Sequence, residues 1–144
     1  AGGEAAHNVH MAEHLMTDGK VGYIHRDCGR IGGIGPAKTV AASAAAQGVT
    51  YVNHTFTSHL ALSASLQPFA GLYDHNICEF PAQPSRLATD LTTNHLQRDV
   101  NGMVRAPESP GLGVDIHLPS LAPYLVDTEI VVNGEVLYQT PALD

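Results

Sequence analysis

Short apolar runs alternate with alanine-rich and leucine-rich stretches along the first 81 residues. Residues 21–24, 50–52 and 76–78 are rich in β-branched, aromatic or other apolar side chains, and polar or charged residues follow each run. Runs of this length and composition are typical of strands that are partly or fully buried. The pattern therefore predicts three strands.

The stretches between these runs have helical spacing. A first helix is expected just before residue 21. Its apolar face would consist of Val9, Ala12, Leu15 and Met16. A second helix is expected over residues 36–47, with Pro36 in its first turn and Gly48 as its stop signal. A third is expected over residues 58–66, where Pro68 ends it.

The expected strands begin near residues 21, 50 and 76, and 26 to 29 residues is the length of a βα unit in a parallel sheet. After Pro81 the sequence becomes rich in prolines, which predicts a tail made mostly of loops. Asn133-Gly134 predicts a hairpin within this tail. The sequence thus predicts an α/β fold with two parts, the βα units of residues 1–81 and an extension over residues 82–144.

Composition narrows the possible partners. Hydrophobic residues make up 44% of the 144 residues, charged residues 15%, and the formal net charge is −7. This predicts a packed core, and it excludes a nucleic-acid partner because phosphate backbones demand clustered cations. No apolar run suggests a membrane partner, and we expect a cytoplasmic protein that acts on small molecules. The two cysteines, Cys28 and Cys78, predict packing residues rather than a disulfide framework.

Ionisable residues follow the expected strands, where chemistry gathers in parallel α/β folds. Asp27, His54 and Glu79 each come after a run, and Glu4 stands as though it closed an earlier strand. A hydrogen bond between Asp27 and His54 would fix the imidazole tautomer and make a general base. The alternative is that each residue only caps a helix or satisfies a loop. His25 could point to the same face and is left without a role.

These residues carry a resemblance to a known family. The chain resembles the C-terminal part of the enolase superfamily, and its mandelate racemase subgroup in particular. The motifs that carry the resemblance are Gly3-Glu4, the run from Asp27 to Ile34, Asn53-His54-Thr55-Phe56, Cys78-Glu79-Phe80-Pro81 and Pro110-Gly111-Leu112-Gly113-Val114.

The resemblance implies a fold and a set of roles. The fold would be the C-terminal portion of a TIM-like (β/α)7β barrel, from the end of strand five through strand eight, with a tail that returns to a capping domain. Glu4 would be a ligand of an essential Mg²⁺, and Asp27 and His54 would form the base dyad. Glu79 would bind the substrate carboxylate as it becomes an enediolate, which needs a cation and an acid for its charge.

The resemblance also implies an activity. We expect part of a Mg²⁺-dependent sugar-acid dehydratase, with a 2-hydroxy-acid racemase or epimerase as an alternative. A complete barrel of this type takes roughly 200–250 residues, so we expect the rest of the barrel to be supplied by the same or a separate chain, within a homo-oligomer. Without it, the chain would be a catalytically silent fragment.

Two other motifs suggest different kinds of binding site. The run from His10 to His14 fits the H-x-x-E-H pattern of a zinc peptidase, although a solvated histidine face that includes His7 accounts for it better. The glycine-rich stretch over residues 29–35 could bind phosphate. It lacks the ending of a P-loop, however, and tight turning beside the catalytic rim is the better explanation.

Overall fold

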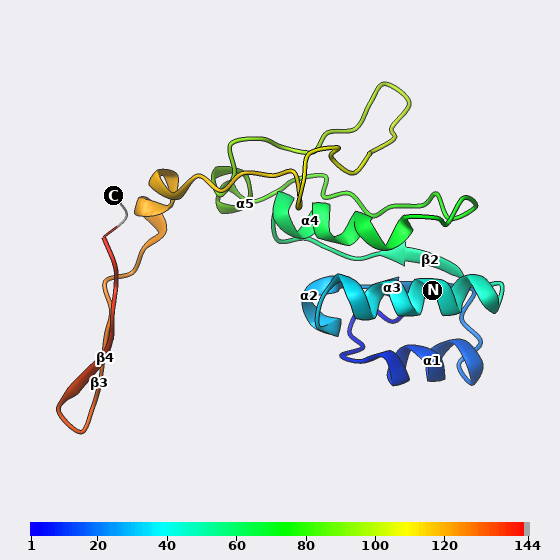
Figure 1. The fold of residues 1–144 in the computed structure, drawn as a ribbon, viewed down its shortest axis with the longest axis horizontal. Helices are drawn as coiled ribbons and strands as arrows, with labels where there is room; N and C mark the ends of the chain where they lie inside the picture. The colour runs from blue at the N-terminus through cyan, green and yellow to red at the C-terminus, as the bar shows by residue number, and fades with distance from the viewer. Residues whose placement is uncertain (143–144) are drawn as a thin grey trace.

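Two short parallel strands form the centre of the fold in the computed structural model, which describes residues 1–142 (Figure 1). Strand β1 (Tyr23–Arg26) pairs with β2 (Thr50–Asn53), with Tyr23 opposite Thr50. On the other edge of β1, Gly2 forms an isolated parallel bridge with Ile24. The chain before Glu4 therefore lies beside β1 at this one bridge.

Helices bury their apolar faces around this centre. Helix α1 (Val9–Thr17) packs beside α3 (Ile34–Ala46), as Figure 1 shows. The short α2 (Cys28–Ile31) follows β1, and α4 (His59–Leu66) runs into the 3₁₀ turn η1 (Gln67–Phe69). The core they share is built around the fully buried residues Ala12, Ile24, Ala37, Val40, Ala41, Ala44 and Tyr51.

The three predicted helices are confirmed, and local signals explain their ends. Helix α4 begins where Ser58 accepts a hydrogen bond from the N–H of Ala61 at 3.1 Å. Helix α3 begins two residues earlier than expected, at Ile34. Pro36 still falls within its first turn. Backbone N–H groups there have no partner within the helix, so the N–H that proline lacks costs no hydrogen bond. Gly48, with φ at 69°, follows the end of α3.

The third predicted strand is wrong. Residues 76–80 are irregular, although they lie beside β2. Side chains replace the expected main-chain ladder: the Nδ1 atom of His75 accepts from the N–H of Tyr51 at 2.8 Å, and the Asn53 amide bonds to the main chain of Glu79. The apolar pattern indicated correctly that this segment is packed, but not how its backbone is paired.

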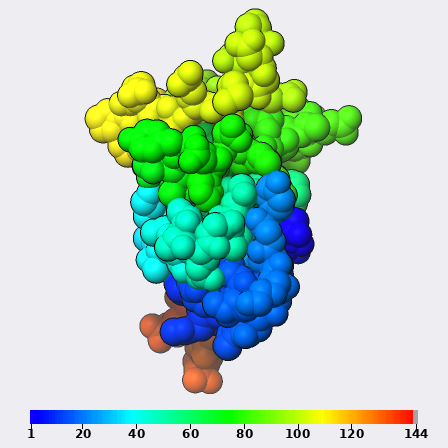
Figure 2. Space-filling view, turned by 90° about the vertical axis from the view of Figure 1, so that its right-hand side faces the viewer, coloured from blue at the N-terminus to red at the C-terminus, as the bar shows by residue number. Residues whose placement is uncertain are grey.

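The chain after residue 82 contains short elements joined by loops: α5 (Arg86–Asp90), η2 (Leu118–Tyr124), β3 (Glu129–Val132) and β4 (Glu135–Gln139). In the space-filling view its yellow and yellow-green part lies across one end of the packed helices (Figure 2), and Leu96 packs there against Leu62 and Leu66. The predicted hairpin at Asn133-Gly134 is confirmed as β3 and β4. Both turn residues have positive φ, 52° and 83°, as a type I′ turn requires.

The hairpin projects away from the remaining chain, and its residues are exposed (Figure 1). Across residues 1–142, no helix is both long and apolar enough to cross a membrane.

Candidate active site

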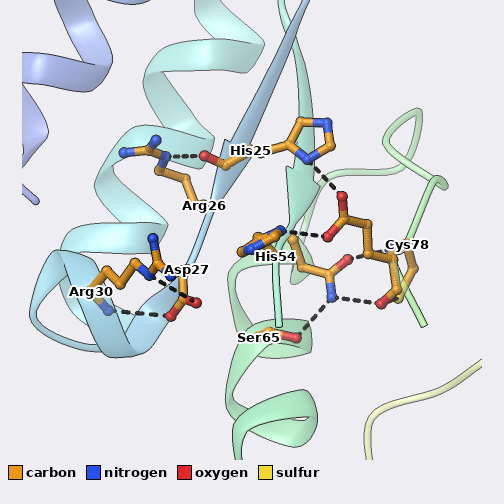
Figure 3. Close-up of polar contacts among 9 residues, drawn as sticks. His25, Arg26, Asp27, Arg30, His54, Ser65 and Cys78 are labelled. Carbon is orange, nitrogen blue, oxygen red and sulfur yellow. Dashed lines mark hydrogen bonds and ion pairs between the residues drawn. The ribbon is translucent and has the colours of Figure 1, made fainter. Parts of the chain in front are cut away.

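His54 follows β2 directly, and its imidazole faces Glu79 (Figure 3). The Nδ1 atom of His54 lies 2.7 Å from Oε2 of Glu79. The His54 side chain is only 11% exposed, and the ring of Phe56 packs edge-on against it with centroids 4.6 Å apart. These contacts fix the ring plane, and in the described part of the chain His54 uses only Nδ1 for hydrogen bonding. Its Nε2 atom makes no hydrogen bond with the described residues.

The other oxygen of Glu79 is bound by His25. The Nδ1 atom of His25 on β1 lies 2.9 Å from Oε1 of Glu79, so one carboxylate joins two imidazoles (Figure 3). The neighbouring strands bring these rings together, because the N–H of His54 donates to the carbonyl of Arg26, the residue after His25, at 2.8 Å. A carboxylate between two ring N–H donors keeps the protons on the Nδ1 atoms.

Asn53 fixes the main chain of Glu79. Its side chain is fully buried; its Oδ1 accepts from the N–H of Glu79 at 2.9 Å, and its Nδ2 donates to the carbonyl of Glu79 at 3.1 Å. The same Nδ2 donates to Oγ of Ser65 on α4 at 2.9 Å. The amide thereby ties Glu79 to both β2 and α4.

Asp27 follows β1 directly, as expected, but its carboxylate has other partners than His54. It caps helix α2, where Oδ1 accepts from the N–H groups of Gly29 at 2.8 Å and Arg30 at 3.2 Å. Its Oδ2 lies 3.9 Å from Nε of Arg30. The structure thus gives His54 the carboxylate of Glu79 as its partner, in place of the expected hydrogen bond with Asp27. Helix capping is the alternative that the sequence had left open.

Asp27 and His54 nevertheless border the same open cavity of about 690 Å³. Arg30, Phe56 and Ser58 also line it. A cavity of this size accommodates a small polar metabolite. His54 lines this cavity and is hydrogen-bonded to Glu79, so its ring connects the half-buried carboxylate to the cavity.

The imidazoles of His54 and His25 influence the pKa of the Glu4 carboxyl group. Its pKa is lowered, first by a hydrogen bond from its own backbone N–H and then by the proximity of His54 and His25, while burial opposes the shift. Glu4 is therefore a carboxylate at neutral pH. The bridge at Gly2 places it on the far side of β1 from β2.

Residues 1–120 match the family described as enolase C-terminal domain-like. This chain belongs to that family. The enolase superfamily resemblance seen in the motifs is confirmed, and with it a mixed α/β fold of the enolase C-terminal type. The relatives include a predicted mandelate racemase and two proteins named as cycloisomerases.

Three relatives show how much of an enolase-type protein the chain represents. It is 62% identical to a predicted mandelate racemase from Rhodobacter sphaeroides, whose crystal structure it matches with a TM-score of 0.92 over 98% of this chain and 36% of that one. It is 27% identical to D-galactarolactone cycloisomerase from Agrobacterium fabrum over 86% of this chain and 35% of that protein. The structure of 3,6-anhydro-D-galactonate cycloisomerase from Zobellia galactanivorans matches with 27% identity and a TM-score of 0.76, over 87% and 35%.

The chain thus spans about a third of the length of these enolase-type relatives. For the Mg²⁺ that the enolase family implies, Glu4 offers an ionised oxygen ligand, the donor that Mg²⁺ prefers. Glu79 is less suited, since both of its oxygens are bound by imidazoles. The ionised side chain of Glu4 would therefore suit it as one ligand of such a cation.

Other sequence candidates stand apart from this centre. Cys28 is buried and Cys78 half-buried, and burial raises the pKa of each thiol to about 11, so both are packing residues as predicted. His10 and His14 on α1 are exposed, and His14 pairs with Asp18 at 2.9 Å. The one group of metal-ligating side chains found among the described residues does not include them.

Two participants were missed by sequence reasoning. His25 was assigned no role, although its position two residues before Asp27 was a signal that it shares the inner face of β1. Asn53 was treated only as part of a motif. An amide at the end of a buried strand is a usable signal, because it must find hydrogen-bond partners.

Proposed function

We propose that this chain supplies the general acid–base residue of an enzyme. The enzyme removes the proton α to the carboxylate of a sugar acid and then expels a β-oxygen. The observation that carries the proposal is the position of His54, which borders the cavity and is bonded through Nδ1 to Glu79 at 2.7 Å. This is the arrangement of a general base whose tautomer is fixed by a carboxylate.

In the first step, Nε2 of His54 takes the α-proton, and the electron pair of the C–H bond passes into the substrate carboxylate to give an enediolate. Glu79 accepts the Nδ1–H bond throughout and stabilises the imidazolium that forms. Asp27 lines the same cavity as His54. Mg²⁺, when bound at Glu4, would supply positive charge for the enediolate.

In the second step, the enediolate electron pair forms the α–β double bond and the β-oxygen leaves with the proton from His54. If that oxygen is a hydroxyl, water is lost and the reaction is a dehydration. If the oxygen belongs to a ring, the same elimination opens the ring without loss of water, which is an isomerisation. Two relatives named as cycloisomerases support this second outcome.

The other parts of the site are proposed to come from outside this chain, which spans about a third of its relatives. They are the remaining magnesium ligands, any second base needed for a racemase or epimerase, and the rest of a TIM-like barrel with its capping domain. We further propose that Oε1 of Glu79, once protonated, donates a hydrogen bond to the substrate carboxylate when substrate displaces His25, while Oε2 keeps its bond to His54.

The test is α-proton exchange in D₂O, followed by proton NMR. The full-length protein that carries this chain is incubated with Mg²⁺ and a panel of open-chain and cyclic sugar acids. One class should lose its α-proton signal, with a product that has either lost water or kept its mass. His54→Asn should abolish exchange while Mg²⁺ binding persists, and the exposed His10→Asn is the matched control. Unchanged exchange in His54→Asn would remove His54 from the mechanism.

A further inference from the structure

The groups that position the base also form a set of metal ligands. His25, His54 and Glu79 each offer one ligand atom, and these atoms lie within 4.8 Å of one another. They come from three segments: β1, the residue after β2 and the irregular chain beside it. We propose that this triad binds a divalent cation of the zinc class through Nδ1 of both imidazoles and one oxygen of Glu79.

The donor types favour such a cation over Mg²⁺. Two imidazole nitrogens and a glutamate oxygen are a common zinc set when the fourth position is left open, whereas Mg²⁺ takes oxygen ligands. The triad is therefore chemically distinct from Glu4, the carboxylate assigned above to Mg²⁺. The triad side chains are 11% to 30% exposed, so water can reach a fourth position.

The geometry requires only a small adjustment. Tetrahedral zinc with bonds of about 2.0–2.1 Å holds its donors about 3.3 Å apart, so donor atoms that lie within 4.8 Å of one another need to close by at most roughly 1.5 Å. Oε1 of Glu79 lies 2.9 Å from Nδ1 of His25 and Oε2 lies 2.7 Å from Nδ1 of His54, and Glu79 belongs to an irregular segment of the chain. Rotation of the Glu79 side chain and the two rings can supply this closure.

The consequence for the enzyme is inhibition, and this part rests on the proposed function. A neutral imidazole that binds a cation through Nδ1 carries its proton on Nε2. His54 then has no lone pair for the α-proton, and Glu79 no longer accepts from it. Zinc-class cations should therefore inhibit at this triad even when Mg²⁺ is saturating.

The test uses Co²⁺, a spectroscopic substitute for Zn²⁺, with the full-length protein. All measurements use a protein that carries the double substitution His10→Asn/His14→Asn. These two exposed histidines on α1 lie one turn apart and can chelate metal themselves. We expect visible d–d absorption of low-symmetry Co²⁺, displaced by Zn²⁺ but not by excess Mg²⁺. Both His25→Gln and Glu79→Gln should weaken binding at least tenfold, with circular dichroism as the check on folding.

Each outcome decides the proposal. Co²⁺ binding that persists in both triad variants overturns it, as does binding that disappears with His10 and His14. Loss of binding in the folded triad variants supports it. The direct binding signal needs no substrate, so a bound triad in a protein without α-proton exchange would retain the metal site and reject only the proposed function.

Discussion

The side-chain amide of Asn53 takes the place of a neighbouring strand for Glu79. It accepts from the N–H of Glu79 at 2.9 Å and donates to its carbonyl at 3.1 Å, as a strand residue would. With the main chain held on both groups, the carboxylate reaches His54 at 2.7 Å. A single buried side chain thus positions the residue that links the two imidazoles.

Asn53→Leu is expected to destabilise the protein by about 2–4 kcal/mol, because both main-chain groups of Glu79 lose their partner in a buried setting. Urea unfolding measures the loss. Ser65→Ala is the matched control: it removes one contact of the same amide but leaves both bonds to Glu79, so its effect should be clearly smaller. Equal losses in the two variants would contradict the special role of the Glu79 bonds.

Glu4→Gln is expected to lower Mg²⁺ affinity roughly tenfold or more, since a neutral amide replaces an ionised ligand beside the cation. Isothermal titration with Mg²⁺ measures the change, and activity at saturating Mg²⁺ should recover at least in part. The exposed carboxylate Glu108 provides the control variant Glu108→Gln. Normal Mg²⁺ binding by Glu4→Gln would refute the ligand role of Glu4.

His59 should make stability depend on pH. Burial, aided by His95, lowers its pKa, and its Nδ1 accepts from the N–H of Leu96 at 3.2 Å. The unfolded chain therefore binds the proton more readily than the folded one, and stability falls as the pH drops below the unfolded value of about 6.5. His59→Asn keeps an acceptor but cannot titrate. Its melting temperature should fall less between pH 7.5 and pH 5 than that of the parent protein.

The two thiols should resist alkylation in the folded protein. With pKa values raised to about 11 by burial, Cys28 and Cys78 are almost entirely protonated at pH 8. We expect iodoacetamide to modify them roughly a hundredfold more slowly than an exposed cysteine. Mass spectrometry of samples with and without urea measures this rate. Rapid labelling of either cysteine under native conditions would show that its surroundings are open.

Local signals predicted most of the elements correctly. Gly48 marked the end of α3 and Asn133-Gly134 marked the hairpin, because helix stops and turns depend on the conformational preferences of adjacent residues. The segment over residues 76–78 was misread. Its apolar pattern reports burial, and whether a buried segment pairs through its backbone depends on neighbours that are distant in sequence.

The sequence by itself determined the family, the parallel βα arrangement and the group of ionisable residues after the strands. Only the tertiary structure determined which carboxylate is hydrogen-bonded to His54. Asp27 is held by the N–H groups of its own helix α2, while Asn53 fixes Glu79 next to both imidazoles. The physical reason is distance: a hydrogen bond requires about 3 Å, and spacing along the chain does not specify separations between segments to that precision.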